Sequence, residues 1–146
     1  MNKKGYSKQG KKNRAAGVRF EAKVRAELKL QGWIISKWMN NVDLEKDAII
    51  PAKRKYNPFL RALSIGNGFP DFVCFKKAGK KNYEVIGVEV KRNGWLSKQE
   101  KEKCLWYLKK EAFSKILIAK SAKDGRFVKT VYIDFKEKYK KDFPEQ

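Results

Sequence analysis

The spacing of apolar residues near the start of the chain predicts an amphipathic helix from Ala15 to about Gln31. Its apolar residues recur at every fourth position and therefore lie on one helix face: Ala16, Phe20, Val24 and Leu28. Gly32 follows directly, and a glycine at this place is typical of a helix end. Glu21 lies beside the apolar stripe, so its carboxylate can point along the edge of the surface on which the helix packs.

A second helix is predicted to begin near Lys98. Ser97 and Glu100 have the Ser-x-x-Glu spacing of a capping box, in which each side chain accepts a hydrogen bond from a backbone N–H at the helix start. The apolar residues that follow at helical spacing are expected to enter the core: Leu105, Leu108 and Ala112.

Five further segments have the composition and alternation of β-strands. They are residues 33–39, 69–76, 83–91, 114–119 and 127–135. A polar turn, residues 77–82, separates the second from the third and predicts an antiparallel hairpin. The fourth is almost wholly apolar and follows a helix, which favours a buried strand parallel to its neighbour. The resulting order, α-β-β-β-α-β-β, predicts an α/β protein with a central mixed sheet flanked by helices.

Two stretches lack such periodicity and are predicted to be irregular. Residues 1–14 carry basic side chains and no acidic ones, which indicates a flexible basic arm ahead of a single domain spanning residues 15–146. Residues 40–68 are predicted to form an extended basic loop with a proline-bracketed segment. The basic side chains expected to contact nucleic acid are Lys11, Lys12, Lys53, Arg54, Lys55 and Arg92.

The charge balance of the chain points to a polyanionic partner. Lys and Arg number 36 against 16 Asp and Glu, which gives a formal net charge of +20 at pH 7. Each phosphate neutralised by Lys or Arg releases condensed counterions, so such a surface binds nucleic acid without regard to sequence. A basic surface that serves only solubility is the alternative that composition leaves open.

Histidine is absent, and its absence excludes several kinds of active site. There is no Ser-His-Asp or Cys-His nucleophile system, no His-ligated zinc and no imidazole acid or base. Cys74 and Cys104 each lie in an apolar stretch and are predicted to be reduced core residues of a cytoplasmic protein. No apolar run approaches the length of a membrane span, so no membrane partner is expected. Any catalysis must therefore depend on carboxylates, lysine or a hard metal ion.

A candidate for that chemistry is the group formed by Asp71, Glu89 and Lys91 on the predicted hairpin. Side chains alternate along a strand, so Glu89 and Lys91 emerge on one face while Val88 and Val90 enter the other. Antiparallel pairing places the start of one strand, at Asp71, beside the end of the next, at Glu89. Two adjacent carboxylates repel each other unless a proton or cation lies between them, and oxygen ligands suit Mg²⁺ or Mn²⁺. Alternatively, Asp71 closes a turn while Glu89 and Lys91 form a solvated cross-strand pair.

Four segments resemble the motifs of a known enzyme superfamily. They are Arg19-Phe20-Glu21 followed by Val24, Leu28 and Gly32-Trp33; Gly68-Phe69-Pro70-Asp71; Val88-Glu89-Val90-Lys91; and Leu96-Ser97-x-x-Glu100. Across residues 15–120 the chain resembles the PD-(D/E)xK nuclease superfamily, and within it the archaeal-type Holliday junction resolvases and related small repair nucleases. The resemblance implies the restriction-endonuclease-like fold and a homodimeric, Mg²⁺-dependent endonuclease acting on branched or structured DNA, with Mn²⁺ able to substitute.

The resemblance also implies a role for individual residues. Asp71 and Glu89 would be metal ligands, and the carbonyl of Val90 would be a third. Lys91 would be the catalytic lysine, and Glu21 an outer metal ligand acting directly or through water. Gln99, at the start of the second helix, matches a glutamine that orients the lysine or the scissile phosphate. The same role could equally belong to Glu100.

Other functions stay open beside this one. Residues 40–68 are longer than the corresponding loop of the compact resolvases, and the Gly-Phe-Pro-Asp and Leu-Ser segments also resemble the virus-type replication-repair nuclease module, which prefers flapped or other branched substrates. A non-catalytic nucleic-acid-binding protein on the same scaffold and an RNA-associated structural protein are the remaining alternatives. Trp95 and Trp106 lie near the predicted site and are candidates for base stacking or a dimer contact, with core packing favoured for Trp106.

Overall fold

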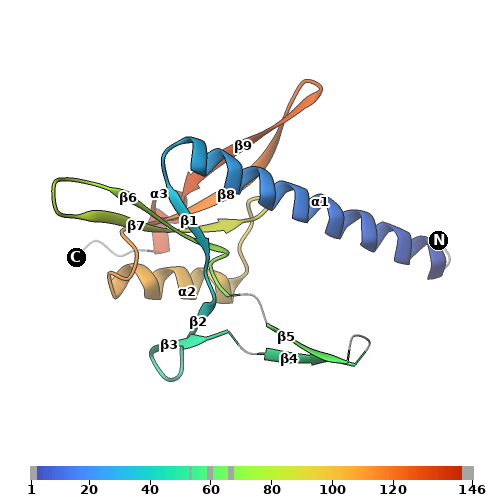
Figure 1. The fold of residues 1–146 in the computed structure, drawn as a ribbon, viewed down its shortest axis with the longest axis horizontal. Helices are drawn as coiled ribbons and strands as arrows, with labels where there is room; N and C mark the ends of the chain where they lie inside the picture. The colour runs from blue at the N-terminus through green and yellow to red at the C-terminus, as the bar shows by residue number, and fades with distance from the viewer. Residues whose placement is uncertain (1–2, 53, 59–60, 66–67, 143–146) are drawn as a thin grey trace.

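The structure is a computed structural model that describes residues 3–52, 54–58, 61–65 and 68–142 (Figure 1). Its elements in chain order are α1 (Lys3–Leu30), β1 (Ile34–Lys37), β2 (Asn40–Asp43), β3 (Ala48–Pro51), β4 (Arg54–Asn57), β5 (Ala62–Ile65), β6 (Phe72–Lys77), β7 (Tyr83–Val90), α2 (Lys98–Lys109), β8 (Lys115–Asp124), β9 (Phe127–Asp134), α3 (Phe135–Lys138) and the 3₁₀ turn η1 (Lys140–Asp142). None of the helices in the described part of the chain has the length and apolarity that a membrane crossing requires.

The centre of the molecule is a five-stranded sheet with the strand order β1-β6-β7-β8-β9. β7 and β8 are parallel, and the other neighbouring pairs are antiparallel. The predicted α/β class and mixed sheet are therefore confirmed, and so is the parallel placement of the apolar strand that follows α2. A crossover through a helix is what parallel neighbours require, because a tight turn can join only antiparallel strands.

Helices α1 and α2 cover opposite faces of this sheet (Figure 1). The predicted stripe Phe20, Val24 and Leu28 on α1 packs against alternate residues of the sheet, including Phe72 and Val88. The intervening sheet residues, with α2 and α3, form a second cluster: Val42, Phe69, Leu96, Cys104, Tyr107, Phe113, Ile116, Ile118 and Phe135. Both cysteines are buried and unpaired. The alternation along β7 therefore separates two cores: Ile86, Val88 and Val90 pack on the α1 side, and Glu89, between the last two, projects on the α2 side.

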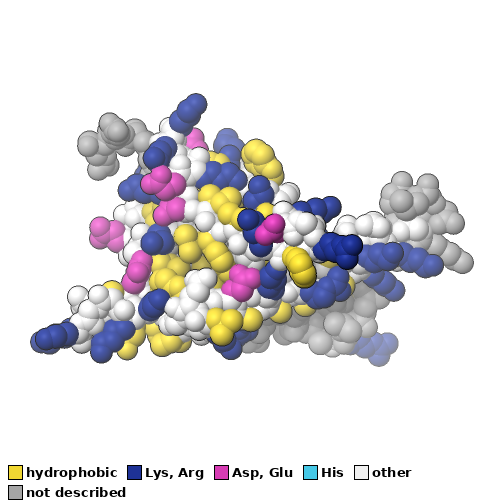
Figure 2. Space-filling model, turned by 90° about the horizontal axis from the view of Figure 1, so that it is seen from above, with side chains coloured by type: hydrophobic (Ala, Val, Ile, Leu, Met, Phe, Trp, Pro, Cys, Tyr) yellow, Lys and Arg dark blue, Asp and Glu magenta, His cyan; other side chains and the backbone are white. Residues whose placement is uncertain are grey.

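The first helix is longer than the sequence pattern predicts. α1 begins at Lys3, so most of the segment expected to be a flexible arm is helical. The apolar stripe marks only the part that packs on the sheet, whereas the preceding residues are rich in lysine, which favours a helix without needing a partner surface. This part of α1 projects from the body of the protein (Figure 1), and Lys and Arg side chains follow it in Figure 2.

Residues 40–68 also contain more regular structure than predicted. The region expected to be an extended loop holds two hairpins, β2–β3 and β4–β5. Val42 of β2 is buried in the second cluster, which anchors the first hairpin to the body. Short strands of four residues carry too little alternation to stand out in a sequence, particularly where prolines interrupt them.

Gly68 lies where two backbones approach closely, just ahead of Asp71. A Cβ at this position would lie 2.0 Å from the Trp38 carbonyl oxygen and 2.7 Å from that of Asn40. We expect Gly68→Ala to lower the free energy of unfolding by roughly 3 kcal/mol, because backbone atoms cannot move aside as a side chain can. Urea denaturation measures this change. Gly79→Ala, whose Cβ would meet nothing within 4 Å, is the control, and equal stability of the two variants would contradict the prediction.

Candidate active site

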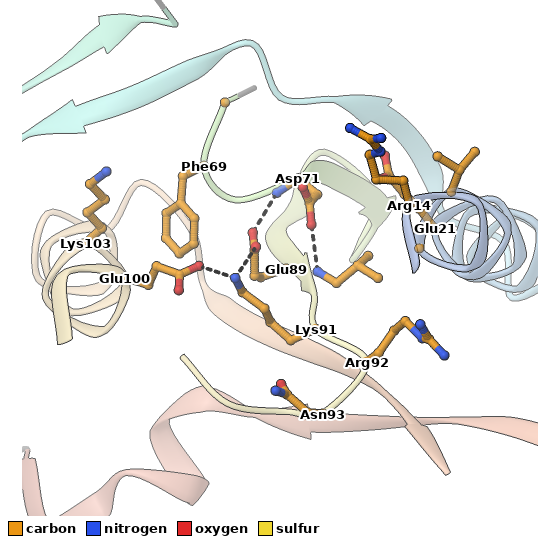
Figure 3. Close-up of a pocket in the computed structure, with 14 residues that line it drawn as sticks. Arg14, Glu21, Phe69, Asp71, Glu89, Lys91, Arg92, Asn93, Glu100 and Lys103 are labelled. Carbon is orange, nitrogen blue, oxygen red and sulfur yellow. Dashed lines mark hydrogen bonds and ion pairs between the residues drawn. The ribbon is translucent and has the colours of Figure 1, made fainter. Parts of the chain in front are cut away.

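The antiparallel pairing of β6 with β7 places Asp71 beside Glu89. The register pairs Phe72 with Val88, so Asp71, one residue earlier, lies opposite Glu89, one residue later. The backbone N–H of Asp71 donates to Glu89 Oε2 at 3.1 Å, and the N–H of Val90 donates to Asp71 Oδ2 at 2.8 Å. These two reciprocal bonds, drawn in Figure 3, hold one oxygen of each carboxylate and fix the pair side by side.

Lys91 completes the group from the residue after β7. Its Nζ lies 3.9 Å from Glu89 Oε1 and 2.8 Å from Glu100 Oε2 on α2. Glu100 uses its other oxygen to accept the N–H of Ser97 at 3.0 Å, while Ser97 Oγ accepts the N–H of Glu100 at 3.2 Å. The predicted capping box is therefore present. One carboxylate both closes the first turn of α2 and orients the lysine toward the acidic pair.

The acidic pair is largely removed from water. Glu89 is only 5% exposed, and among the described residues it is the one charged residue that is buried. Burial, together with the charge of Asp71, raises the pKa of Glu89 to about 9. Burial also raises the pKa of Asp71 to about 6, opposed by its hydrogen bond from Val90 and assisted by the charge of Glu21. The site therefore favours a proton or a cation between the two carboxylates.

Lys91 and Glu100, the partners of this pair, are instead both stabilised in their charged forms. Burial acts to lower the pKa of Lys91, but the hydrogen bond and charge of Glu100, with the charges of Glu89 and Asp71, raise it overall. Burial acts to raise the pKa of Glu100, but its bonds to Lys91 and Ser97 lower it overall. Lys91 is therefore held as an ammonium ion and Glu100 as a carboxylate at neutral pH.

These residues open into a pocket of about 800 Å³ between α1, β7 and α2 (Figure 3). Glu21 lines it from α1, on the opposite side from Glu100. Four basic side chains also line it: Arg14, Lys91, Arg92 and Lys103. The predicted residues Glu21, Asp71, Glu89, Val90, Lys91 and Arg92 thus lie around one space. No family model, curated protein or solved structure matches the chain. What the site does has therefore to be inferred from its own geometry.

The donor atoms suit a small hard cation. Asp71 and Glu89 supply carboxylate oxygens, which Mg²⁺ and Mn²⁺ prefer, and their mutual repulsion is relieved by a positive ion. No group of three or more acidic or cysteine side chains gathers as a metal site in the parts of the chain that the structure describes. Glu21, although it lines the pocket, is thus not part of a three-carboxylate cluster.

The remaining predicted residues lie outside this space or outside the described structure. Gln99 is exposed and does not line the pocket, and its neighbour Glu100 faces Lys91 instead. Lys11 and Lys12 are exposed on the projecting part of α1. Lys53 lies outside the described residues, and so do the side chains of Arg54 and Lys55, whose backbone belongs to β4. At the start of α2 it is thus the side chain of Glu100 that contacts Lys91.

Three pocket residues with polar side chains were not singled out in the sequence: Arg14, Asn93 and Lys103. Arg14 precedes Glu21 by seven residues, so both lie on one face of a continuous helix. The sequence pattern did not show this relation, because residues 1–14 were predicted to be flexible and the helix to begin at Ala15. Lys103 follows Glu100 by three residues on α2 and shares its face for the same reason. Helical spacing counted from the predicted acidic residues would have found both basic residues, whereas no comparable signal marks Asn93.

Replacing Glu100 separates its two roles. Gln can still accept the N–H of Ser97, so Glu100→Gln is expected to keep the capping box while lowering the pKa of Lys91, because the negative charge that raises it is removed. Glu100→Ala is expected to lower the pKa similarly and to lose about 1 kcal/mol of stability as well. NMR titration of the Lys91 side chain and thermal unfolding measure the two effects. An unchanged lysine pKa in both variants would contradict the assignment.

Proposed function

We propose that this protein is a metal-dependent DNA endonuclease that hydrolyses phosphodiester bonds. The observation that carries the proposal is the pair of buried, hydrogen-bonded carboxylates, Asp71 and Glu89, with the ammonium group of Lys91 beside them in an open pocket. Two repelling acids beside a lysine are costly to bury and have no evident structural purpose. Perturbed pKa values in a cleft are typical of catalytic groups.

The residues present fit a bound Mg²⁺ ion. Asp71 and Glu89 would hold it, with the carbonyl of Val90 as a third ligand, and it would supply Lewis-acid stabilisation of charge on the phosphate. Lys91 would place its ammonium group against the same phosphate and stabilise the negative charge that develops during cleavage. Glu100 would keep Lys91 protonated and aimed at that point. Glu21 would bind water at the edge of the acidic pair.

The basic surface around the pocket supports a nucleic-acid substrate. The projecting part of α1 carries exposed basic residues that lead toward the pocket: Lys8, Lys11, Lys12 and Arg14. Residues 3–16 extend over roughly 20 Å at the rise of an α-helix, which corresponds to about six base pairs of duplex DNA. Because Arg14 lines the pocket itself, a phosphate backbone that follows this helix would enter the site.

The finer assignment rests on the resemblance noted in the sequence. We infer that the sheet and its two helices form a restriction-endonuclease-like fold, supported by the acidic pair at adjacent strand ends and by Lys91 directly after β7. By the same resemblance the substrate would be branched or structured DNA, as for the Holliday junction resolvases, and the enzyme would be a homodimer. This assignment is an analogy of fold and motif, whereas the cation and phosphate chemistry is argued from this site alone.

The test is a cleavage assay with defined DNA shapes. Purified protein is incubated with linear duplex, flapped duplex and four-way-junction DNA of matched sequence, with Mg²⁺ or with a chelator. We expect cleavage in Mg²⁺, none with the chelator, and faster cutting of a branched form than of the linear duplex. Tight DNA binding without cleavage of any form would support a non-catalytic binding protein instead and would overturn the proposal.

A further inference from the structure

A second group of basic and aromatic residues lies beyond the pocket, where the loop after Lys91 meets α3. Trp95 is 68% exposed, and Lys138 Nζ lies 5.0 Å from the centroid of its ring. Lys138 also lies 5.5 Å from the Tyr139 ring centroid, and Lys101 lies 4.6 Å from it. The side chain of Lys120 packs against Gly94, next to Trp95. We call these five residues, Trp95, Lys101, Lys120, Lys138 and Tyr139, the Trp95 cluster.

The loop that carries Trp95 is fixed by hydrogen bonds to its surroundings. The N–H of Gly94 donates to the Lys91 carbonyl at 2.8 Å, and the N–H of Trp95 donates to Asn93 Oδ1 at 3.0 Å. Lys138 Nζ donates to the Gly94 carbonyl at 2.6 Å. An exposed indole on a restrained loop loses little conformational freedom when it binds a partner, so it is suited to recognition.

The lysines of the cluster lack acidic partners. No ion pair with a carboxylate is found for Lys101, Lys120 or Lys138 within the described residues. Partial burial and the charges of Lys120 and Lys101 hold the pKa of Lys138 below its ordinary value, as expected where cations crowd together. An anion bound among them would relieve this repulsion. The combination of an exposed aromatic face with unpaired cations matches the base and the phosphate of a nucleotide.

We propose that the Trp95 cluster binds an unpaired nucleotide of the DNA substrate, with its base stacked on Trp95 and its phosphate among the lysines. The inference rests on the proposed nuclease function and narrows its substrate to DNA with a single-stranded segment beside the cleaved bond. Trp95 follows Lys91 by four residues, so their Cα atoms are at most roughly 14 Å apart. A base paired within a duplex cannot offer its face to the indole, whereas a base in a flap or an open branch can.

A binding experiment tests the cluster without relying on cleavage. Binding of a fluorescein-labelled oligothymidylate and of a blunt duplex is measured by anisotropy in the presence of a chelator. We expect Trp95→Ala to bind the single strand about tenfold more weakly and the duplex within twofold of the unsubstituted protein, while Trp95→Phe retains most of the single-strand affinity. Phe127→Ala, which removes another exposed aromatic side chain outside the cluster, is the matched control and is expected to change neither.

Two outcomes would overturn the inference. One is equal affinity of Trp95→Ala and the unsubstituted protein for the single strand. The other is a change of oligomeric state in Trp95→Ala on size-exclusion chromatography, which would show that the indole contacts a second copy of the chain.

Cleavage assays separate this inference from the proposed function. In Mg²⁺, we expect the preference for flapped over blunt DNA to fall at least fivefold in Trp95→Ala, with the rate on blunt DNA unchanged. Cleavage with an unchanged preference would overturn the nucleotide subsite and leave the nuclease intact. Single-strand binding that depends on Trp95, without cleavage of any DNA, would support the subsite while overturning the nuclease.

Discussion

Replacing Asp71 with Asn or Lys91 with Ala is expected to slow DNA cleavage in Mg²⁺ by at least about 100-fold. Asp71→Asn removes one of the two carboxylate charges that would hold the cation, and Lys91→Ala removes the ammonium group that would stabilise charge on the phosphate. The affinity of both variants for DNA should stay within about threefold of that of the unsubstituted protein, because most phosphate contacts are expected to come from other basic residues. Single-turnover cleavage and equilibrium binding on the same substrate measure the two quantities separately.

The exposed pair Asp47 and Lys110 offers a matched control for these substitutions. Lys110 Nζ lies 3.0 Å from Asp47 Oδ2, and neither residue lines the pocket. Asp47→Asn and Lys110→Ala make the same chemical changes on the surface and are expected to leave cleavage unchanged. Full activity in both Asp71→Asn and Lys91→Ala would show that catalysis occurs elsewhere.

Replacing Glu89 with Gln is expected to stabilise the protein when no divalent cation is present. Glu89 is buried beside Asp71, and its pKa is raised to about 9 from an ordinary value of 4.5. The unfolded chain therefore releases this proton at a lower pH than the folded protein does, and stability falls as pH rises from about 4.5 to about 9. One pKa unit corresponds to about 1.4 kcal/mol, so we expect Glu89→Gln to gain at least 2 kcal/mol at pH 8.

Thermal unfolding as a function of pH measures this gain, which corresponds to about 5 °C in Tm. The difference between the two proteins should vanish near pH 4, where Glu89 is protonated in both folded and unfolded states. Addition of Mg²⁺ should raise the Tm of the unsubstituted protein but not that of Glu89→Gln. Glu84→Gln on the same strand, whose partner Lys115 lies 3.7 Å away and is partly exposed, is the control. A loss of stability in Glu89→Gln at pH 8 would contradict the prediction.

The central sheet and the acidic pair could be predicted because each depends on a short-range pattern. Alternation along residues 83–91 and the turn before them determine which strands pair and in which register. Once that register is known, the positions of Asp71 and Glu89 follow from the geometry of antiparallel strands. The capping box at Ser97 likewise depends on residues three positions apart. Local spacing therefore located the site as well as the strands that carry it.

Other features depended on contacts that local patterns do not record. Arg14 reaches the pocket only because α1 continues without a break beyond its apolar stripe. The choice between Gln99 and Glu100 depends on the rotation of α2 against the sheet, which is set by packing of Cys104 and Tyr107 into the second cluster. The burial of Glu89, from which its raised pKa follows, likewise arises from that packing. Tertiary structure supplied these details.

The double role of Glu100 couples the start of α2 to the proposed catalytic group. The same carboxylate closes the first helical turn and pairs with Lys91, so fraying of that turn would release the lysine. Helix ends open and close far more often than whole domains unfold. Hydrogen exchange at the Ser97 and Glu100 amides should therefore report how often the lysine is free, and a phosphate that engages Lys91 would compete with Glu100 and speed that exchange.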